Sequence, residues 1–303
     1  MTGRYRALLH ALRALRGEPA GSRLAPTEPA VRYHARTARG ITPLADIYLP
    51  PRVSSPSVVL VHGGAFVIGS RRMKPVRYLA ARLVEAGIAV CAIDYRMIFR
   101  GGRLDEAVDD VCDAFAFWRA RAPDPEAVSL VGLSAGATLA MLATSRLAQP
   151  TSRLAQPTSR LAQPTSRLAQ PASRLGPGPS RLACCFGLYE LDQLEGSVAR
   201  ALPRLLLGTS DRATWRDRSP RGMPQPEVPT LLLHGGDDGI VPVAQARRLT
   251  THREALGLPT RLVIYPDAPH GFFSVPGAAA EAGVRALVEH VAPAQRARTG
   301  SHA

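Results

Sequence analysis

The chain has 303 residues, of which 46% are hydrophobic, so it is long enough to bury a sizeable core within one large domain. Its formal net charge is +14, but every basic residue except Lys74 is an arginine, and the arginines are spread along the chain without base-stacking aromatic residues. This pattern argues against a nucleic-acid-binding protein. The four cysteines have neither metal-ligand nor redox spacing, so we expect reduced core residues, no metal and no cofactor. They are Cys91, Cys112, Cys184 and Cys185.

The first pattern along the chain is amphipathic and covers residues 1–16. Leu8, Leu9, Leu12 and Leu15 fall on one side of a helix, and arginines fall largely on the other. The apolar stretch is too short for a signal peptide or a membrane span, so we expect neither secretion nor an integral membrane segment. A helix with a basic polar face can also lie on a membrane surface, which is one interpretation of this segment.

Seven short apolar runs alternate with helix-like patterns along the rest of the chain. The helix-like patterns include residues 76–85 and 104–121. Such alternation predicts an α/β fold with a mostly parallel sheet flanked by helices over residues 41–293, followed by a flexible tail at 294–303. The predicted strands lie near residues 46–49, 57–62, 88–94, 127–132, 182–187, 229–234 and 260–265.

A glycine-rich turn, His62-Gly63-Gly64-Ala65-Phe66, follows the second of these strands. Glycines at a strand end let backbone N–H groups turn inward toward a tetrahedral oxyanion. Each such donor stabilises a transition state by roughly 3 kcal/mol. We therefore expect an oxyanion hole here, built from Gly63, Gly64 and Ala65.

The run Gly132-Leu133-Ser134-Ala135-Gly136 lies directly between a strand-like and a helix-like stretch. A serine at a sharp strand-to-helix turn takes a strained backbone conformation, and the flanking glycines avoid clashes with neighbouring backbone. This context predicts a nucleophile elbow that presents Ser134. The alternative is that Ser134 is an ordinary helix N-cap.

A seven-residue repeat, Thr-Ser-Arg-Leu-Ala-Gln-Pro, occurs four times in tandem over residues 144–171. A proline in every repeat excludes a coiled coil, and one leucine per repeat provides too little apolar surface for a core. The segment lies between the helix after Ser134 and the next strand. We expect an exposed, irregular insertion on the side of the sheet away from the site.

Two further strand ends carry an acid and a histidine. The strand near 229–234 leads into Asp237 and Asp238, and the strand near 260–265 leads into a loop that contains His270. The spacing to Val241-Pro242 favours Asp238 over its neighbour, which is interpreted as a turn former. His62 and His234 both precede the acid, so chain order argues for structural roles for both.

Five motifs in order along residues 43–291 resemble those of α/β-hydrolase serine esterases, closest to the hormone-sensitive-lipase-like branch. They are H-G-G-A-F at 62–66, D-Y-R at 94–96, G-L-S-A-G at 132–136, D-G-I-V-P at 238–242 and P-H-G-F at 269–272. The resemblance implies Ser134 as nucleophile, His270 as general base and Asp238 as the acid that orients it. It also implies that the N–H of Ala135 joins the oxyanion hole.

The resemblance implies a cap as well. In that family an N-terminal helix helps to cover the active site, so residues 1–40 are expected to form part of a cap, and residues 188–226 are a second cap candidate. The implied activity is cleavage of small carboxylic esters through an acyl-enzyme. The cysteines without metal or redox spacing predict a cytoplasmic enzyme, and the sequence makes no prediction of its oligomeric state. Amide-cleaving relatives, such as peptidases or arylformamidases, use the same triad. A non-catalytic binding module is the alternative of another class, although serine, acid and histidine are all retained here.

Overall fold

The computed structural model describes residues 24–34, 43–52, 56–148, 177–194 and 197–292. Its centre is an eight-stranded sheet in the order β1-β2-β4-β3-β5-β6-β7-β8. Strand β2 runs antiparallel to β1 and β4, and the other neighbours are parallel. The strands are β1 (Glu28–Arg32), β2 (Leu44–Tyr48), β3 (Ser57–Val61), β4 (Ala89–Ile93), β5 (Val128–Leu133), β6 (Leu182–Cys185), β7 (Thr230–Gly235) and β8 (Thr260–Tyr265).

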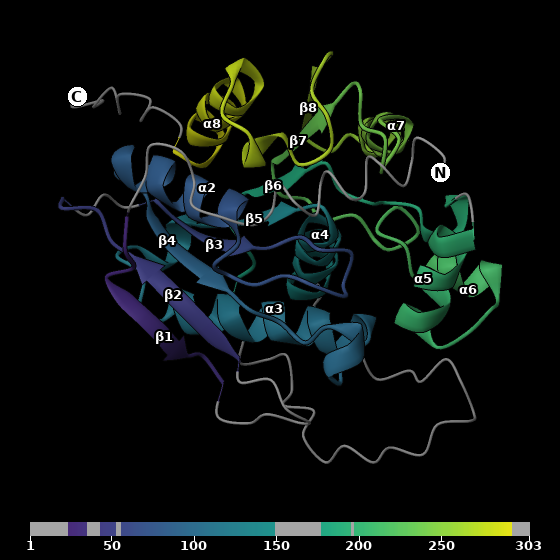
Figure 1. Ribbon diagram of the computed structural model, residues 1–303, viewed down its shortest axis with the longest axis horizontal. Helices are drawn as coiled ribbons and strands as arrows, with labels where there is room; N and C mark the ends of the chain where they lie inside the picture. Colours follow the sequence, from purple (N-terminus) through teal and green to yellow (C-terminus); the bar gives the residue numbers. More distant parts are fainter. Residues whose placement is uncertain (1–23, 35–42, 53–55, 149–176, 195–196, 293–303) are drawn as a thin grey trace, which may run out of the picture.

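Helices cover both faces of the sheet, as the alternating pattern predicts. Helices α2 and α8 pack against one face, and α3, α4 and α7 contribute to the core on the other. Figure 1 shows α3 on the opposite side of the sheet from α2 and α8. The bounds are α2 (Lys74–Glu85), α3 (Leu104–Arg119), α4 (Ala135–Leu147), α7 (Ala244–Ala255) and α8 (Ala278–Val291). In this arrangement the strands β3, β5, β6, β7 and β8 end at one edge of the sheet.

All seven predicted strands are present within a few residues of their expected bounds, but β1 was not predicted. It lies within residues 1–40, which were assigned to a helical cap segment, so that assignment is wrong for residues 28–32. These residues form an edge strand, with Val31 opposite Ala45 of β2. The amphipathic pattern at 1–16 and the tail at 294–303 lie outside the described residues.

The first residues of the heptapeptide repeat are helical, which corrects the expectation of an irregular segment from residue 144 onward. Helix α4 continues to Leu147, and both Thr144 and Ser145 are buried. Their hydroxyls donate to the carbonyls of Ala140 (2.7 Å) and Met141 (3.0 Å), the bonds by which serine and threonine are accommodated inside helices. The remainder of the repeat lies outside the described residues.

The segment expected as a second cap, residues 188–226, leaves the sheet after β6. It contains α5 (Ser197–Leu207) and α6 (Arg212–Asp217), which Figure 1 shows at the right of the view, away from the helices that flank the sheet. The buried carboxylate of Glu190 binds Arg221 (2.8 Å) and Arg248 of α7 (2.6 Å). These ion pairs hold the start and the end of the segment against the sheet-covering helix α7.

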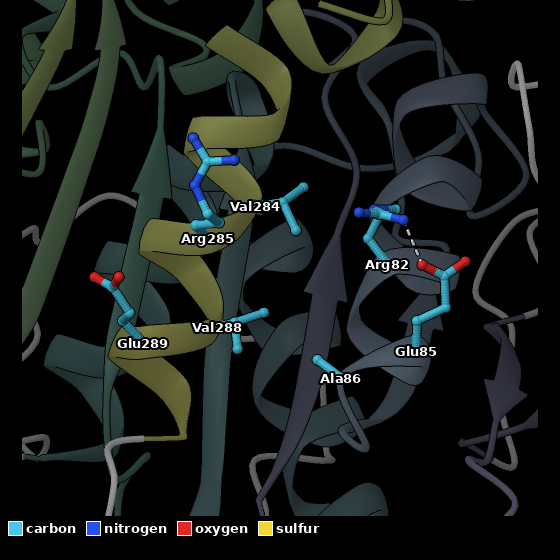
Figure 2. A pocket seen from close by; sticks show the side chains of 7 residues that line it. All are labelled: Arg82, Glu85, Ala86, Val284, Arg285, Val288 and Glu289. Atoms are coloured by element: carbon cyan, nitrogen blue, oxygen red, sulfur yellow. Dashed lines mark hydrogen bonds and ion pairs between the residues drawn. The ribbon is translucent and has the colours of Figure 1, made fainter. Parts of the chain in front are cut away.

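Helices α2 and α8 lie next to each other and border an open groove, shown in Figure 2. Its lining combines valines with charged side chains, and Arg82 is paired with Glu85 on its own helix. None of the predicted site residues lines this groove. Among the described residues, no helix is both long and apolar enough to cross a membrane.

Candidate active site

Ser134 lies at the turn between β5 and α4, with φ 51° and ψ −118°. A non-glycine residue in this left-handed region is strained, so the surroundings must hold it. They do so in part through the N–H of Ser134, which donates to the carbonyl of Cys185 at the end of β6 (2.9 Å). Ser134 occupies the N-cap position of α4, but its side chain makes no capping hydrogen bond, so it is not an ordinary N-cap.

The glycines on either side of Ser134 are required by close backbone approach. A Cβ on Gly132 would lie 2.3 Å from the carbonyl oxygen of Gly136, and a Cβ on Gly136 would lie 2.3 Å from that of Val61. Both distances are well below any normal contact, so neither position accepts a side chain without backbone movement. The G-x-S-x-G pattern therefore reflects how tightly α4 packs against the ends of β3 and β5.

The structure brings Ser134, His270 and Asp238 together from three separate strand ends. His270 Nε2 lies 2.9 Å from Ser134 Oγ, and His270 Nδ1 lies 2.8 Å from Asp238 Oδ2. The imidazole thus connects the hydroxyl to the carboxylate in one line of hydrogen bonds. This is the geometry in which a histidine can take a proton from serine while a carboxylate holds its tautomer.

The Asp238 side chain is fully buried, and every oxygen has partners. Oδ1 accepts from the N–H groups of Ile240 (2.9 Å) and Val241 (2.8 Å), while Oδ2 faces His270 and His234. Burial alone would raise the pKa of this carboxyl, but the histidine and backbone N–H donors outweigh it and hold the pKa of Asp238 well below its usual range. Asp237, in contrast, is exposed, so the carboxylate next to the histidine is Asp238.

The predicted oxyanion loop passes directly beside Ser134. A Cβ on Gly63 would lie 3.1 Å from the Ser134 Cβ, and the next three residues all have positive φ: Gly64 (118°), Ala65 (53°) and Phe66 (62°). Among the described residues, no oxygen accepts a hydrogen bond from the N–H of Gly64 or Ala65. Ala135 begins α4, where backbone N–H groups have no partner within the helix. This end of the sheet therefore has free donors on both sides of Ser134.

His62, the residue before this loop, is buried and serves the loop rather than the triad. Its Nδ1 lies 2.6 Å from the carbonyl of Gly63, and its ring stacks on Tyr95 with 4.3 Å between centroids. Burial lowers the pKa of His62, which favours the neutral ring. The D-Y-R motif is structural in the same sense, because Tyr95 donates to the His62 carbonyl and Arg96 pairs with Asp110.

Two residues of the site were missed or given only a structural role in the sequence analysis. Phe186 has φ 44° and places its ring edge-on to His270, with 5.1 Å between centroids. His234 lies 3.2 Å from Asp238 Oδ2. The only sequence signal for either was its place at the end of an apolar run, which also fits an ordinary core residue.

The fold and this site define an α/β-hydrolase of the serine-esterase class. A family model described as BD-FAE matches residues 45–252, more than half of the chain, and the chain belongs to this family of α/β-hydrolase-type esterases. The expected family and fold are thereby confirmed.

Curated relatives match over only part of their length. A probable isoprenylcysteine alpha-carbonyl methylesterase, ICME, from Oryza sativa subsp. japonica is 39% identical over 104 residues, which cover 32% of this chain and 24% of that protein. The non-reducing polyketide synthase ausA from Aspergillus calidoustus is 35% identical over 137 residues, covering 38% of this chain and 5% of the synthase. The chain therefore spans about a quarter or less of these relatives.

Solved structures match over nearly the whole chain. A truncated carbohydrate esterase from gut microbiota superposes with a TM-score of 0.70 at 19% identity, covering 91% of this chain and 99% of that one. Esterase B from Lactobacillus rhamnosis gives 0.68 at 18% identity, with 95% and 92% covered. Butyrate-bound esterase 2 from Thermogutta terrifontis gives 0.62 at 21% identity, with 86% and 91% covered. At these identities the likeness shows the shared fold.

Proposed function

We propose that this protein hydrolyses small carboxylic esters through an acyl-enzyme on Ser134. The observation that carries the proposal is the continuous hydrogen-bonded line from Ser134 through His270 to Asp238, next to free N–H donors. A binding module would need none of this alignment. Membership of an esterase family agrees with it.

In the first step, His270 Nε2 takes the proton of Ser134 Oγ while the oxygen attacks the ester carbonyl. Asp238 keeps Nδ1 protonated and stabilises the imidazolium that forms. The carbonyl oxygen becomes an oxyanion, which accepts hydrogen bonds from the N–H groups of Gly64, Ala65 and Ala135, while Gly63 leaves the room that a side chain would fill.

The tetrahedral intermediate then collapses. The bond to the alcohol oxygen breaks, His270 gives its proton to that oxygen, and the acyl group stays on Ser134. Water repeats the sequence in the second half: His270 removes its proton, the water oxygen attacks the acyl carbon, and the acid leaves as Ser134 regains its proton. No cofactor is needed for any step.

The proposed substrate class is small esters, and residues 188–226 are proposed to shape access to Ser134. The names of similar proteins, a methylesterase and esterase structures with butyrate or propionate bound, agree with a short acid or alcohol part. Amides are the second candidate, since the triad chemistry is the same. A panel of short-chain esters, long-chain esters and aryl amides separates the two, and we expect turnover of short-chain esters to exceed that of amides.

A cytoplasmic location is also proposed. All four cysteines are free and buried, and burial raises the pKa of each thiol, to about 12 for Cys112 and Cys184. Such thiols are unreactive core residues, as is usual where the medium keeps thiols reduced.

The direct test is labelling with a fluorophosphonate probe followed by mass mapping. We expect a single modified residue, Ser134, and loss of both labelling and ester hydrolysis in Ser134→Ala with the melting temperature retained. Ser129→Ala is the matched control, because Ser129 lies on the same strand with its buried hydroxyl bound to Ser180 (3.2 Å). Undiminished labelling of Ser134→Ala would contradict the proposal.

A further inference from the structure

His234 occupies the carboxyl end of β7 and has no solvent-exposed surface. One ring nitrogen, Nε2, lies 3.0 Å from the carbonyl oxygen of Val241 and 3.2 Å from Asp238 Oδ2. The second distance involves the same carboxylate oxygen that faces His270 Nδ1. Two histidines from different strands therefore approach one oxygen of the acid.

The contacts fix the position of the proton on His234. A carbonyl oxygen and a carboxylate oxygen both accept hydrogen bonds only, so Nε2 must carry the proton and donate it. The Nδ1 atom is buried and has no hydrogen-bond partner among the described residues. A proton on Nδ1 would be a buried donor without an acceptor, so the contacts favour the tautomer that carries its proton on Nε2.

The Nε2–H of His234 faces two acceptors in the turn that carries Asp238, the Val241 carbonyl and the Asp238 carboxylate. Asp238 Oδ1 is already fixed by the N–H groups of Ile240 and Val241, which close the turn on one side. His234 binds the Val241 carbonyl on the other side and restrains Oδ2 at the same time. Without this N–H, Oδ2 would be held within the described structure by His270 alone.

We propose that His234 is a positioning residue for the esterase reaction, acting through Asp238 by holding its carboxylate in the orientation that meets His270. A packing role alone explains the position poorly. The preceding β7 residues Leu231, Leu232 and Leu233 are buried and apolar, and a fourth aliphatic side chain would avoid the partnerless Nδ1 atom. The inference rests on the proposed function, in which Asp238 orients His270.

A double-mutant cycle tests it, using Asp238→Asn, His234→Leu and the combination, with kcat and KM measured on a short-chain ester. We expect His234→Leu to lower kcat by about 10- to 100-fold, the range that outer partners of a catalytic group typically contribute, with KM unchanged. In the Asp238→Asn background the same change should cost less than about threefold, because a residue that acts through Asp238 has nothing left to position. His234→Gln, which returns an N–H near the Nε2 position, should recover most of the lost kcat.

His290→Leu is the matched control. Its Nε2 also binds a carbonyl oxygen, that of Leu182 at 3.0 Å, but Leu182 starts β6 at the edge of the sheet opposite the triad. We expect His234→Leu and His290→Leu both to lower the melting temperature, because each removes a buried hydrogen bond. Only His290→Leu should leave kcat within about twofold. Equal costs of His234→Leu with and without Asp238, or a His234→Gln variant as impaired as His234→Leu, would overturn the inference. An Asp238→Asn variant with full activity would instead overturn the proposed function.

Discussion

At the scale of single residues, the site is organised around strained and buried groups that surrounding contacts compensate. Five non-glycine residues in the described part of the chain have positive φ. One, Ala30, lies at an irregularity in the edge strand β1, and the other four lie at or shortly after the carboxyl ends of β3, β5 and β6: Ala65, Phe66, Ser134 and Phe186. Such strain persists only where neighbouring structure over-determines the backbone. Its concentration at one edge of the sheet marks that edge as the functional one.

Asp238→Asn tests the choice between adjacent acids. The asparagine keeps the shape of the side chain but removes its charge and favours the wrong imidazole tautomer, so kcat should fall by about four orders of magnitude, as in the serine-protease template. Asp237→Asn changes an exposed carboxylate and should leave kcat within about twofold. Steady-state kinetics of the two variants decide the matter, and the reverse order of effects would contradict the assignment.

At the scale of elements, the site depends on how closely α4 approaches the end of β3. Backbone of Gly136, in the first turn of α4, packs on the carbonyls of Val61 and His62, the two residues that lead into the oxyanion loop. The proposed nucleophile and the proposed oxyanion donors are therefore set relative to each other by a contact that only glycine permits.

Gly136→Ala should disturb this relation. Its Cβ would lie 2.3 Å from the Val61 carbonyl oxygen, so α4 must move away from β3 by roughly 1 Å, a displacement that can cost about 100-fold in rate. Gly277→Ala is the control, because Gly277 also lies at the start of a helix, α8, and nothing lies within 4 Å of its added Cβ. Loss of kcat together with a lower melting temperature is expected for the first variant only. Wild-type kinetics in Gly136→Ala would refute the argument.

His290 on helix α8 makes stability depend on pH. Its ring binds the Leu182 carbonyl where β6 begins. Burial lowers the pKa of His290 to about 4. The native chain thus binds this proton less readily than the unfolded chain, in which a histidine titrates near 6.5. As the pH falls from about 6.5 to about 4, protonation favours the unfolded chain, so stability contributed by neutral His290 is present above this window and lost across it.

His290→Gln should therefore flatten the pH dependence of stability. We expect the free energy of unfolding of the wild type to fall more steeply than that of the variant between pH 6.5 and pH 4, with parallel curves above pH 7. Urea denaturation at a series of pH values measures both slopes. Identical slopes across the window would show that His290 does not contribute.

At the scale of the whole molecule, the sequence was informative where a pattern has one physical meaning. Short apolar runs that alternate with helix-like patterns predicted seven strands, and a parallel sheet predicted that the motifs at their ends lie together. Strand β1 was not predicted, because an edge strand needs little burial and therefore no apolar run. Its residues are half-buried or exposed. The helical conformation of Thr144 and Ser145 was not predicted, because the repeat has the same sequence in every unit and does not indicate that α4 continues to Leu147. The contact between His234 and Asp238 was not predicted, because the order of residues along the chain does not show that two histidines face the same carboxylate oxygen.

The insertion of repeats is predicted to be dispensable, because both of its described ends lie at the edge of the sheet opposite the triad. Helix α4 leaves Ser134 and ends at Leu147, and the chain returns at residues 177–180, where the N–H of Ser180 donates to the carbonyl of Val128 at the start of β5 (2.8 Å). The two ends are also close together, since a Cβ on Gly178 would lie 3.8 Å from the Leu147 Cβ. A short connection therefore suffices.

Deleting residues 151–171, three whole heptads, shortens the 28 residues between Ala148 and Pro177 to seven. At about 0.6 kcal/mol for each halving of loop length, this reduces the entropy cost of closure by about 1 kcal/mol, so the melting temperature should stay the same or rise slightly. Because the loop begins and ends away from Ser134, kcat and KM should stay within about twofold. Deletions of one, two and three heptads give a graded series in which a length effect on stability is monotonic. A rise in KM that grows along this series would mean that the repeats reach the substrate side of the sheet.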